Sequence, residues 1–356
     1  MSENLIYGAD ITSYGAVGDG NTDCSDAFIK AIENGESLIC LPYGKYFIKK
    51  SIKLTSNTKL HFHPLAELYY EPSEDETHPL FYAEHESSIV IQGGKFHALG
   101  HGYDCGLMKF KNVSNLKLTE FKAYFSSVSL SDCEEVNISK CSFIRINDAV
   151  RISGKCCNVC IKNIDVRNAD TFIKADSCSI VSLNIRNISI NICDSLLELS
   201  TGDATGVLCE DISAAFRNCF VSVKKDFSLE DASFENIDVY SVSHFEGNLE
   251  NAYFYFGGSV DGIDVTGFKR NSDCEAVPFV PALVFKAADD SKAIIDGMML
   301  DNVINARALS KTVDMTTARL TNPTNKFIYT LECGIKKNDT LTIPLGDFDS
   351  LTIYKR

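Results

Sequence analysis

Short alternations of apolar and polar residues recur at a steady interval through the middle of the chain. The segments 112–124, 133–145 and 157–167 each hold two such alternations, separated by a polar pair that often includes Asn. Equivalent apolar positions lie 23 residues apart, as Val136 and Val159 do. Because side chains of a strand point alternately to opposite faces, each alternation predicts a strand with one buried face.

A third alternation completes each repeat, in the segments DAVRIS, TFIKAD, LLELST and FVSVKK. Its apolar positions Ile152, Ala175, Leu199 and Val223 are 23, 24 and 24 residues apart. Three short strands in a repeat of this length predict one turn of a parallel β-solenoid, in which successive turns stack. A leucine-rich repeat has a similar length, but its fixed Leu/Asn pattern is missing. We therefore expect regular coils of about 22–25 residues over 51–250.

The beginning of the chain predicts a cap for this solenoid, because a stack of coils has an exposed apolar end. The stretch YGAVGDGNTDCSDAFIKAIE combines a glycine turn with a helix. Asp23 or Ser25 is suited to cap the helix start, and Gly35 to end it. Four apolar residues share one helix face: Ala27, Phe28, Ala31 and Ile32.

We expect one β-helix domain over 1–356. In this interpretation, residues 1–50 form the cap and the first strands. Residues 251–356 form less regular coils and terminal strands.

Composition and charge restrict the possible binding partners and the cellular compartment of the protein. The net charge of −14 argues against nucleic acid as a partner, and no apolar stretch is long enough to span a membrane. The first residues, MSENLIYGAD, lack the pattern of a secretory signal, which favours a cytoplasmic protein and leaves a secreted mature form open. The 14 cysteines show no zinc-site spacing, so we expect reduced, packed thiols.

Three segments carry a resemblance to a known family: YGAVGDGNTDCSDAFIKAIE, LHFHPLAELYYEP and GGKFHALGHGYDCGLMKFKNVSNLKL. They resemble the N-terminal half of glycoside hydrolase family 28, the polygalacturonases, and more loosely the wider pectate-lyase-like superfamily. The resemblance covers about residues 8–230. It implies an all-β, right-handed parallel β-helix with an N-terminal capping helix.

The same resemblance implies inverting hydrolysis by aspartates on successive coils. Aligning the coils by their inward residues puts Asp148 at one catalytic aspartate and Asp170 at the first residue of a double-aspartate motif. By resemblance, Asp170 is the general acid and Asp148 the base that orients water. The sequence departs from the motif at three positions, where hydroxyl side chains replace an aspartate, a histidine and an arginine: Thr171, Ser195 and Ser222.

An outward row of charged residues accompanies these aspartates. We expect Arg151, Lys174, Glu198 and Lys224 to bind substrate, with the Arg–Lys pair holding a uronate carboxylate. The alternative is a solvated ladder of ion pairs on a strand face. Likewise, Asp148 and Asp170 are alternatively turn residues that bond backbone N–H groups.

The sequence thus favours a polygalacturonase-like glycoside hydrolase acting on a pectin-type or related uronate oligosaccharide. A non-catalytic carbohydrate-binding β-helix and a structural, tailspike-like assembly protein are the alternatives, and a homo-oligomer is compatible with each. A calcium-dependent lyase needs a cluster of carboxylates, whereas the acids here are scattered, so we expect no metal and no other cofactor.

Overall fold

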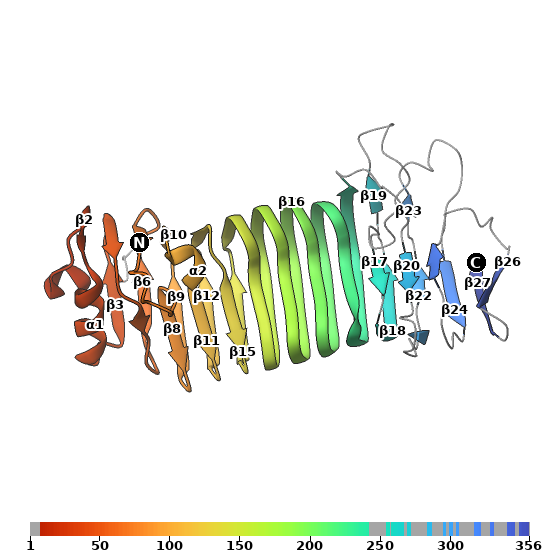
Figure 1. The fold of residues 1–356 in the computed structure, drawn as a ribbon, viewed down its shortest axis with the longest axis horizontal. Coiled ribbons are helices and arrows are strands. Elements are labelled where there is room, and N and C mark those ends of the chain that lie inside the picture. The colour runs from red at the N-terminus through yellow and green to blue at the C-terminus, as the bar shows by residue number, and fades with distance from the viewer. Residues whose placement is uncertain are drawn as a thin grey trace, which may run out of the picture. The chain divides into compact units, whose positions relative to one another are not determined.

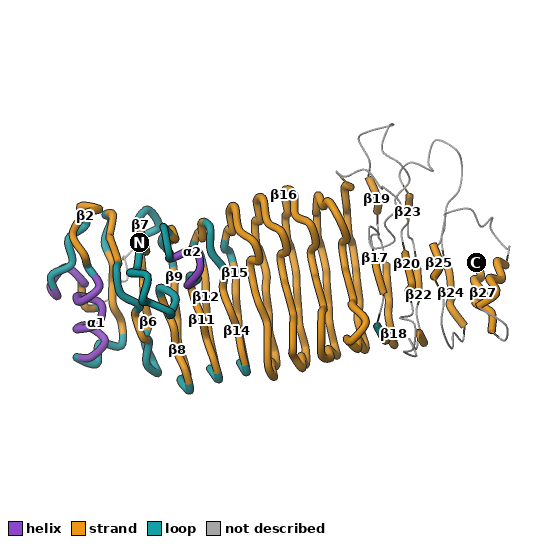
Figure 2. Tube along the Cα trace, in the orientation of Figure 1, coloured by secondary structure: helices purple, strands orange, loops and turns teal. Residues whose placement is uncertain are grey.

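The computed structural model describes residues 8–241 and, beyond them, Gly258 and the short strands between Phe254 and Lys355. The chain divides into two compact units, 1–151 and 152–356. Both consist largely of strands, and the parallel β-helix predicted from the sequence is confirmed (Figures 1 and 2). Among the described residues, no helix is long and apolar enough to cross a membrane.

The first unit is built from three stacks of parallel strands. The first stack holds β1 (Ala9–Asp10), β3 (Leu38–Leu41), β6 (Lys59–Phe62), β9 (Ser87–Gln92), β12 (Ser114–Thr119) and β15 (Glu134–Ser139). The second holds β2 (Asp19–Asp23), β4 (Lys45–Ile48), β7 (Glu67–Tyr70), β10 (Lys95–Ala98), β13 (Lys122–Tyr124) and the start of β16 (Ser142–Ser241). The third holds β5 (Ile52–Lys53), β8 (Phe81–Glu84), β11 (Met108–Lys111) and β14 (Val128–Ser131).

Inward side chains of these stacks form a continuous apolar core. Phe96 packs against Phe62 at a centroid separation of 5.2 Å and against Phe121 at 5.8 Å. Phe121 in turn contacts Phe143 at 5.8 Å. Each coil therefore buries an aromatic ring against those of its neighbours, and rings in edge contact add stability beyond the area that they bury.

Coil length in this unit varies more than the sequence predicted. Leu116 pairs with Val136, 20 residues later, whereas Phe96 pairs with Ala123, 27 residues later. The longer coil contains α2 (Gly102–Cys105) and its flanking loop, inserted between β10 and β11. Insertions of this kind are tolerated at turns because the strands keep their pairing.

The second unit contains parallel strands followed by strands that pair antiparallel. Its parallel strands after β16 are β17 (Phe254–Phe256), β18 (Ser259–Thr266), β19 (Lys269–Asn271), β20 (Leu283–Lys286), β21 (Ile295–Asp296), β22 (Met299–Asp301) and β23 (Ile304–Asn305). The strands that pair antiparallel are β24 (Thr317–Thr321), β25 (Ile328–Thr330), β26 (Thr340–Leu345) and β27 (Asp349–Lys355). A side-chain contact in this unit agrees with the predicted coil length, because Lys174 lies beside Glu198, 24 residues later in the sequence.

The twelve cysteines among the described residues are all free thiols. Burial raises the pKa of Cys141, Cys178 and Cys193 to about 12. A thiol with so high a pKa carries almost no thiolate near neutral pH and is a poor nucleophile. These residues act as small core side chains, as the sequence indicated.

The capping helix is α1 (Ser25–Glu33), preceded by the short 3₁₀ helix η1 (Ile11–Tyr14). Its predicted apolar face is buried, and Gly35 follows the helix with a φ of 78°, as the sequence indicated. The N-cap prediction was wrong in detail, because Cys24 occupies that position without a side-chain bond. Asp23 instead accepts the backbone N–H of Ser25 at 3.0 Å.

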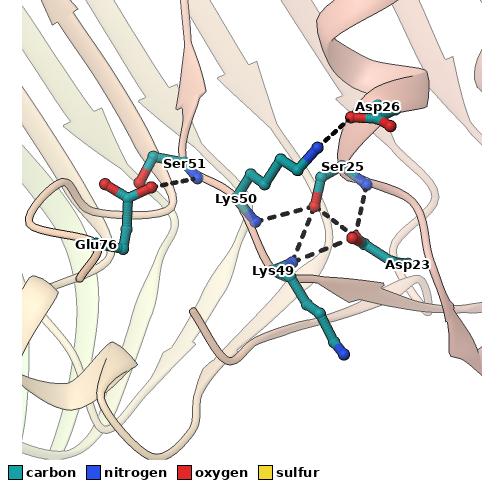
Figure 3. A network of polar contacts seen from close by, with 7 residues as sticks. All are labelled: Asp23, Ser25, Asp26, Lys49, Lys50, Ser51 and Glu76. Carbon is teal, nitrogen blue, oxygen red and sulfur yellow. Dashed lines mark hydrogen bonds and ion pairs between the residues drawn. The ribbon is translucent and has the colours of Figure 1, made fainter. Parts of the chain in front are cut away.

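Ser25 joins the helix to the first coil, as Figure 3 shows. Its buried hydroxyl donates to Asp23 at 2.5 Å and accepts the backbone N–H groups of Lys49 and Lys50 at 2.9 and 3.0 Å. Lys50 also forms an exposed ion pair with Asp26 at 2.8 Å. One serine therefore accepts from two backbone donors, and the N–H of Lys49 also donates to Asp23 at 3.3 Å.

We predict that Ser25→Ala destabilises the protein by about 1–3 kcal/mol, because it leaves buried polar groups without partners. Urea unfolding measures this change. Ser114→Ala, at an exposed strand position, is the control and should leave the midpoint unchanged. Equal midpoints for the two variants would show that the cap does not depend on Ser25.

A column of rings runs across the outer side of the second stack. His97 lies between Tyr69 and Tyr124, at centroid separations of 4.7 and 4.4 Å and with nearly parallel planes. Its Nε2 is buried without a hydrogen-bond partner in the described part of the chain. Burial lowers the pKa of His97, Glu67 raises it, and Lys95 and Lys45 lower it. The fold thus favours neutral His97.

Because the unfolded chain binds this proton more readily, stability should fall as pH drops below the ordinary histidine pKa of about 6.5. We predict that His97→Phe, which keeps a ring in the column, removes part of this loss. Urea unfolding at pH 7.5 and at pH 5.5 tests it. An equal loss of stability between pH 7.5 and pH 5.5 in wild type and variant would show that His97 is not its cause.

Candidate functional site

A pocket of about 310 Å³ opens on the outer side of the third stack in the first unit. Residues from α2, β11, 125–129 and 145–151 line it. The alternation of the strands accounts for the outward side chains. Met108 and Phe110 are buried, so Lys109 between them faces out, and it pairs with Ser129 on the neighbouring coil. Both residues line the pocket.

Asp148 and Arg151, two of the predicted site residues, lie together in this pocket. Arg151 Nε donates to Asp148 Oδ2 at 2.9 Å. Asp148 is only 7% exposed, whereas the Arg151 side chain is half exposed. The backbone turns inward directly after Asp148, because Ala149 and Val150 are both fully buried. A buried carboxylate is thus held in one orientation at the pocket wall.

The other predicted residues belong to the second unit. Asp170 is exposed and precedes the buried Thr171. Lys174 Nζ lies 3.4 Å from Glu198 Oε1, which is the ion-pair arrangement that we considered as the alternative to substrate binding. Lys224 is half buried next to the inward Val223. The structure therefore joins Lys174 to Glu198, and the roles of all four residues stay predictions.

An arginine that sequence reasoning missed supports the turn before Asp170. Arg217 Nε donates to Asp194 Oδ1 at 2.5 Å, and its Nη2 donates to the carbonyl of Ala169 at 3.4 Å. It spans 48 residues of sequence. Contacts between coils thus fix the backbone at the position where the resemblance expects the general acid.

Sequence reasoning also missed most of the pocket wall. Lys109 carried a signal in the alternation of MKFK, but Tyr103 lies in the one-turn helix α2, and Phe125 and Ser126 lie in a loop without a period. The two histidines before α2, His97 and His101, do not line the pocket. His101 Nε2 instead bonds the carbonyl oxygen of Glu76 at 2.9 Å. The loop that follows these histidines supplies the wall.

Comparison with known proteins finds similarity to pectin-related enzymes and to phage appendage proteins. A family model described as rhamnogalacturonase A/epimerase, pectate lyase-like, matches residues 9–64. A probable rhamnogalacturonase C of Aspergillus flavus is 29% identical over 217 residues, covering 56% of this chain and 46% of that protein. A pre-neck appendage protein of Bacillus phage B103 is 48% identical over 58 residues, or 16% of this chain and 7% of its own length. The chain thus spans less than half of either relative.

Among solved structures, the exopolygalacturonase from Thermotoga maritima superposes with a TM-score of 0.53 at 13% identity. The match covers 91% of this chain and 95% of that one, so the likeness concerns the fold. Together with the three stacks of parallel strands, these comparisons confirm the resemblance found in the sequence. The chain is a parallel β-helix that is similar to polygalacturonases and rhamnogalacturonases over part of its length.

Proposed function

We propose that the chain is a polygalacturonase-like glycoside hydrolase that cleaves a pectin-type or related uronate oligosaccharide with inversion. The observation that carries the proposal is a buried carboxylate, Asp148, which lines a pocket on the outer side of the helix and is oriented by Arg151. The names of the similar proteins, a rhamnogalacturonase and an exopolygalacturonase, support the substrate class.

In this proposal, Asp148 is the base. Arg151 binds its Oδ2, so Oδ1 is the oxygen that accepts a proton from the attacking water. The two carboxyl groups of an inverting glycosidase stand about 6.5–9.5 Å apart, which leaves room for that water. Asp170 is the acid that protonates the leaving oxygen. Its assignment rests on the sequence alignment of the coils.

Asp148→Asn and Asp170→Asn should each lower kcat by about 10²- to 10⁴-fold, because each removes one proton-transfer group. Release of reducing ends from galacturonate oligomers measures this loss. The control is Asp211→Asn, at a turn position with a φ of 55° that asparagine tolerates. Full activity in either test variant would move that role to another residue.

A second candidate function is carbohydrate binding without turnover. Asp148 is the single carboxylate among the described residues that line the pocket. Thr171 and Ser195, both buried, stand where the resemblance expects an aspartate and a histidine. Binding of oligomers without release of reducing ends, in wild type as in Asp170→Asn, would favour this function over hydrolysis.

A substitution of Lys174 distinguishes a role in substrate binding from a purely structural ion pair. If Lys174 binds a substrate carboxylate, Lys174→Met should raise KM by about tenfold and leave kcat unchanged, since a charge-assisted bond is lost. An ion pair as exposed as that with Glu198 contributes only about 0–1 kcal/mol to stability, so the urea midpoint should barely move. An unchanged KM would assign the pair to the strand face.

A further inference from the structure

An unsatisfied hydroxyl points to a ligand in the pocket. Ser126 is 6% exposed, and its Oγ has no hydrogen-bond partner among the described residues although it lines the pocket. Leaving a buried polar group unpaired costs about 1–3 kcal/mol. Gly106, which has no side chain, borders the same space, and a Cβ there would lie 4.0 Å from this oxygen. A ligand hydroxyl fits this position, since it can both donate and accept.

Cations that lack an ion-pair partner in the described part of the chain line the same space. Lys109 and Arg145 are exposed and line the pocket, and no carboxylate in the described part of the chain lies within ion-pair distance of either. Arg151 differs, because it is paired with Asp148. The described pocket wall thus carries three cations against one carboxylate, although the whole chain has a net charge of −14. Locally, the wall attracts an anion.

Two exposed rings complete the wall. Tyr103 is 49% exposed and Phe125 37%, and their centroids lie 5.8 Å apart in an edge contact. Large aromatic side chains are usually buried, so two that stay exposed beside polar groups are typical of a binding surface. Apolar ring faces suit the C–H face of a sugar, while the hydroxyl and the cations suit its polar edge.

We propose that Lys109, Arg145, Ser126 and Tyr103 form a subsite that selects a sugar ring with a free carboxylate over the same ring as a neutral ester. Lys109 and Arg145 bind the carboxylate, Ser126 bonds a ring hydroxyl, and Tyr103 packs against the ring. The inference builds on the proposed function, because it assigns the specificity of that pocket. It does not require turnover.

The test compares binding of trigalacturonate with that of its fully methyl-esterified form, by calorimetry on the full chain. Wild type should bind the free acid at least about tenfold more tightly, the gain expected from a charge-assisted bond. Lys109→Met and Arg145→Met should each reduce this ratio severalfold. Lys117→Met, an exposed lysine outside the pocket, should leave it unchanged.

Ser126→Ala distinguishes a binding role from a structural one. It should weaken binding of both oligomers by a similar factor without lowering the urea midpoint, because the hydroxyl has no partner inside the protein. Equal affinity of wild type for acid and ester, or an equal effect of Lys117→Met and Lys109→Met, would overturn the subsite. So would binding of neither oligomer. Loss of turnover with an intact acid preference would instead reject the hydrolase and leave the subsite standing.

Discussion

The structure depends on the pairing of each coil with the next through parallel strands that share one register. In the third stack, Met108 pairs with Phe81 on one side and with Val128 on the other, and all three are buried. A shift of one residue would turn these side chains outward, so the apolar positions fix the register. Outward residues are fixed by the same constraint, and the chemistry of the outer surface follows from it.

This constraint divides the chain into parts that can vary and parts that cannot. Strands hold their alternation, whereas turns accept insertions such as the loop that contains α2. The pocket combines both kinds of residue. Lys109 and Ser129 come from paired strands, while Tyr103 comes from the inserted helix α2 and Phe125 from a loop. A rigid stack thus presents a few strand residues, and the turns shape the space around them.

The predictable part of the site follows the same division. The alternation of inward and outward residues predicted that Arg151 faces outward. The alignment of the coils with the family placed Asp148 three residues before it. In the structure, the two side chains form an ion pair. The strand alternation could not indicate Tyr103 or Ser126, because an inserted one-turn helix and a loop do not follow its period. The cap shows a similar limit. The buried helix face could be read from apolar spacing, but the bonds of Ser25 depend on backbone groups 24 and 25 residues away.

We propose that an acidic sugar binds in the pocket beside Asp148. The most direct measurement is a crystal structure of Asp148→Asn soaked with trigalacturonate, since this variant should bind without consuming the oligomer. We expect a sugar ring within hydrogen-bond distance of Ser126, with its carboxylate against Lys109 or Arg145. A ring bound elsewhere on the protein, with this pocket empty, would contradict it.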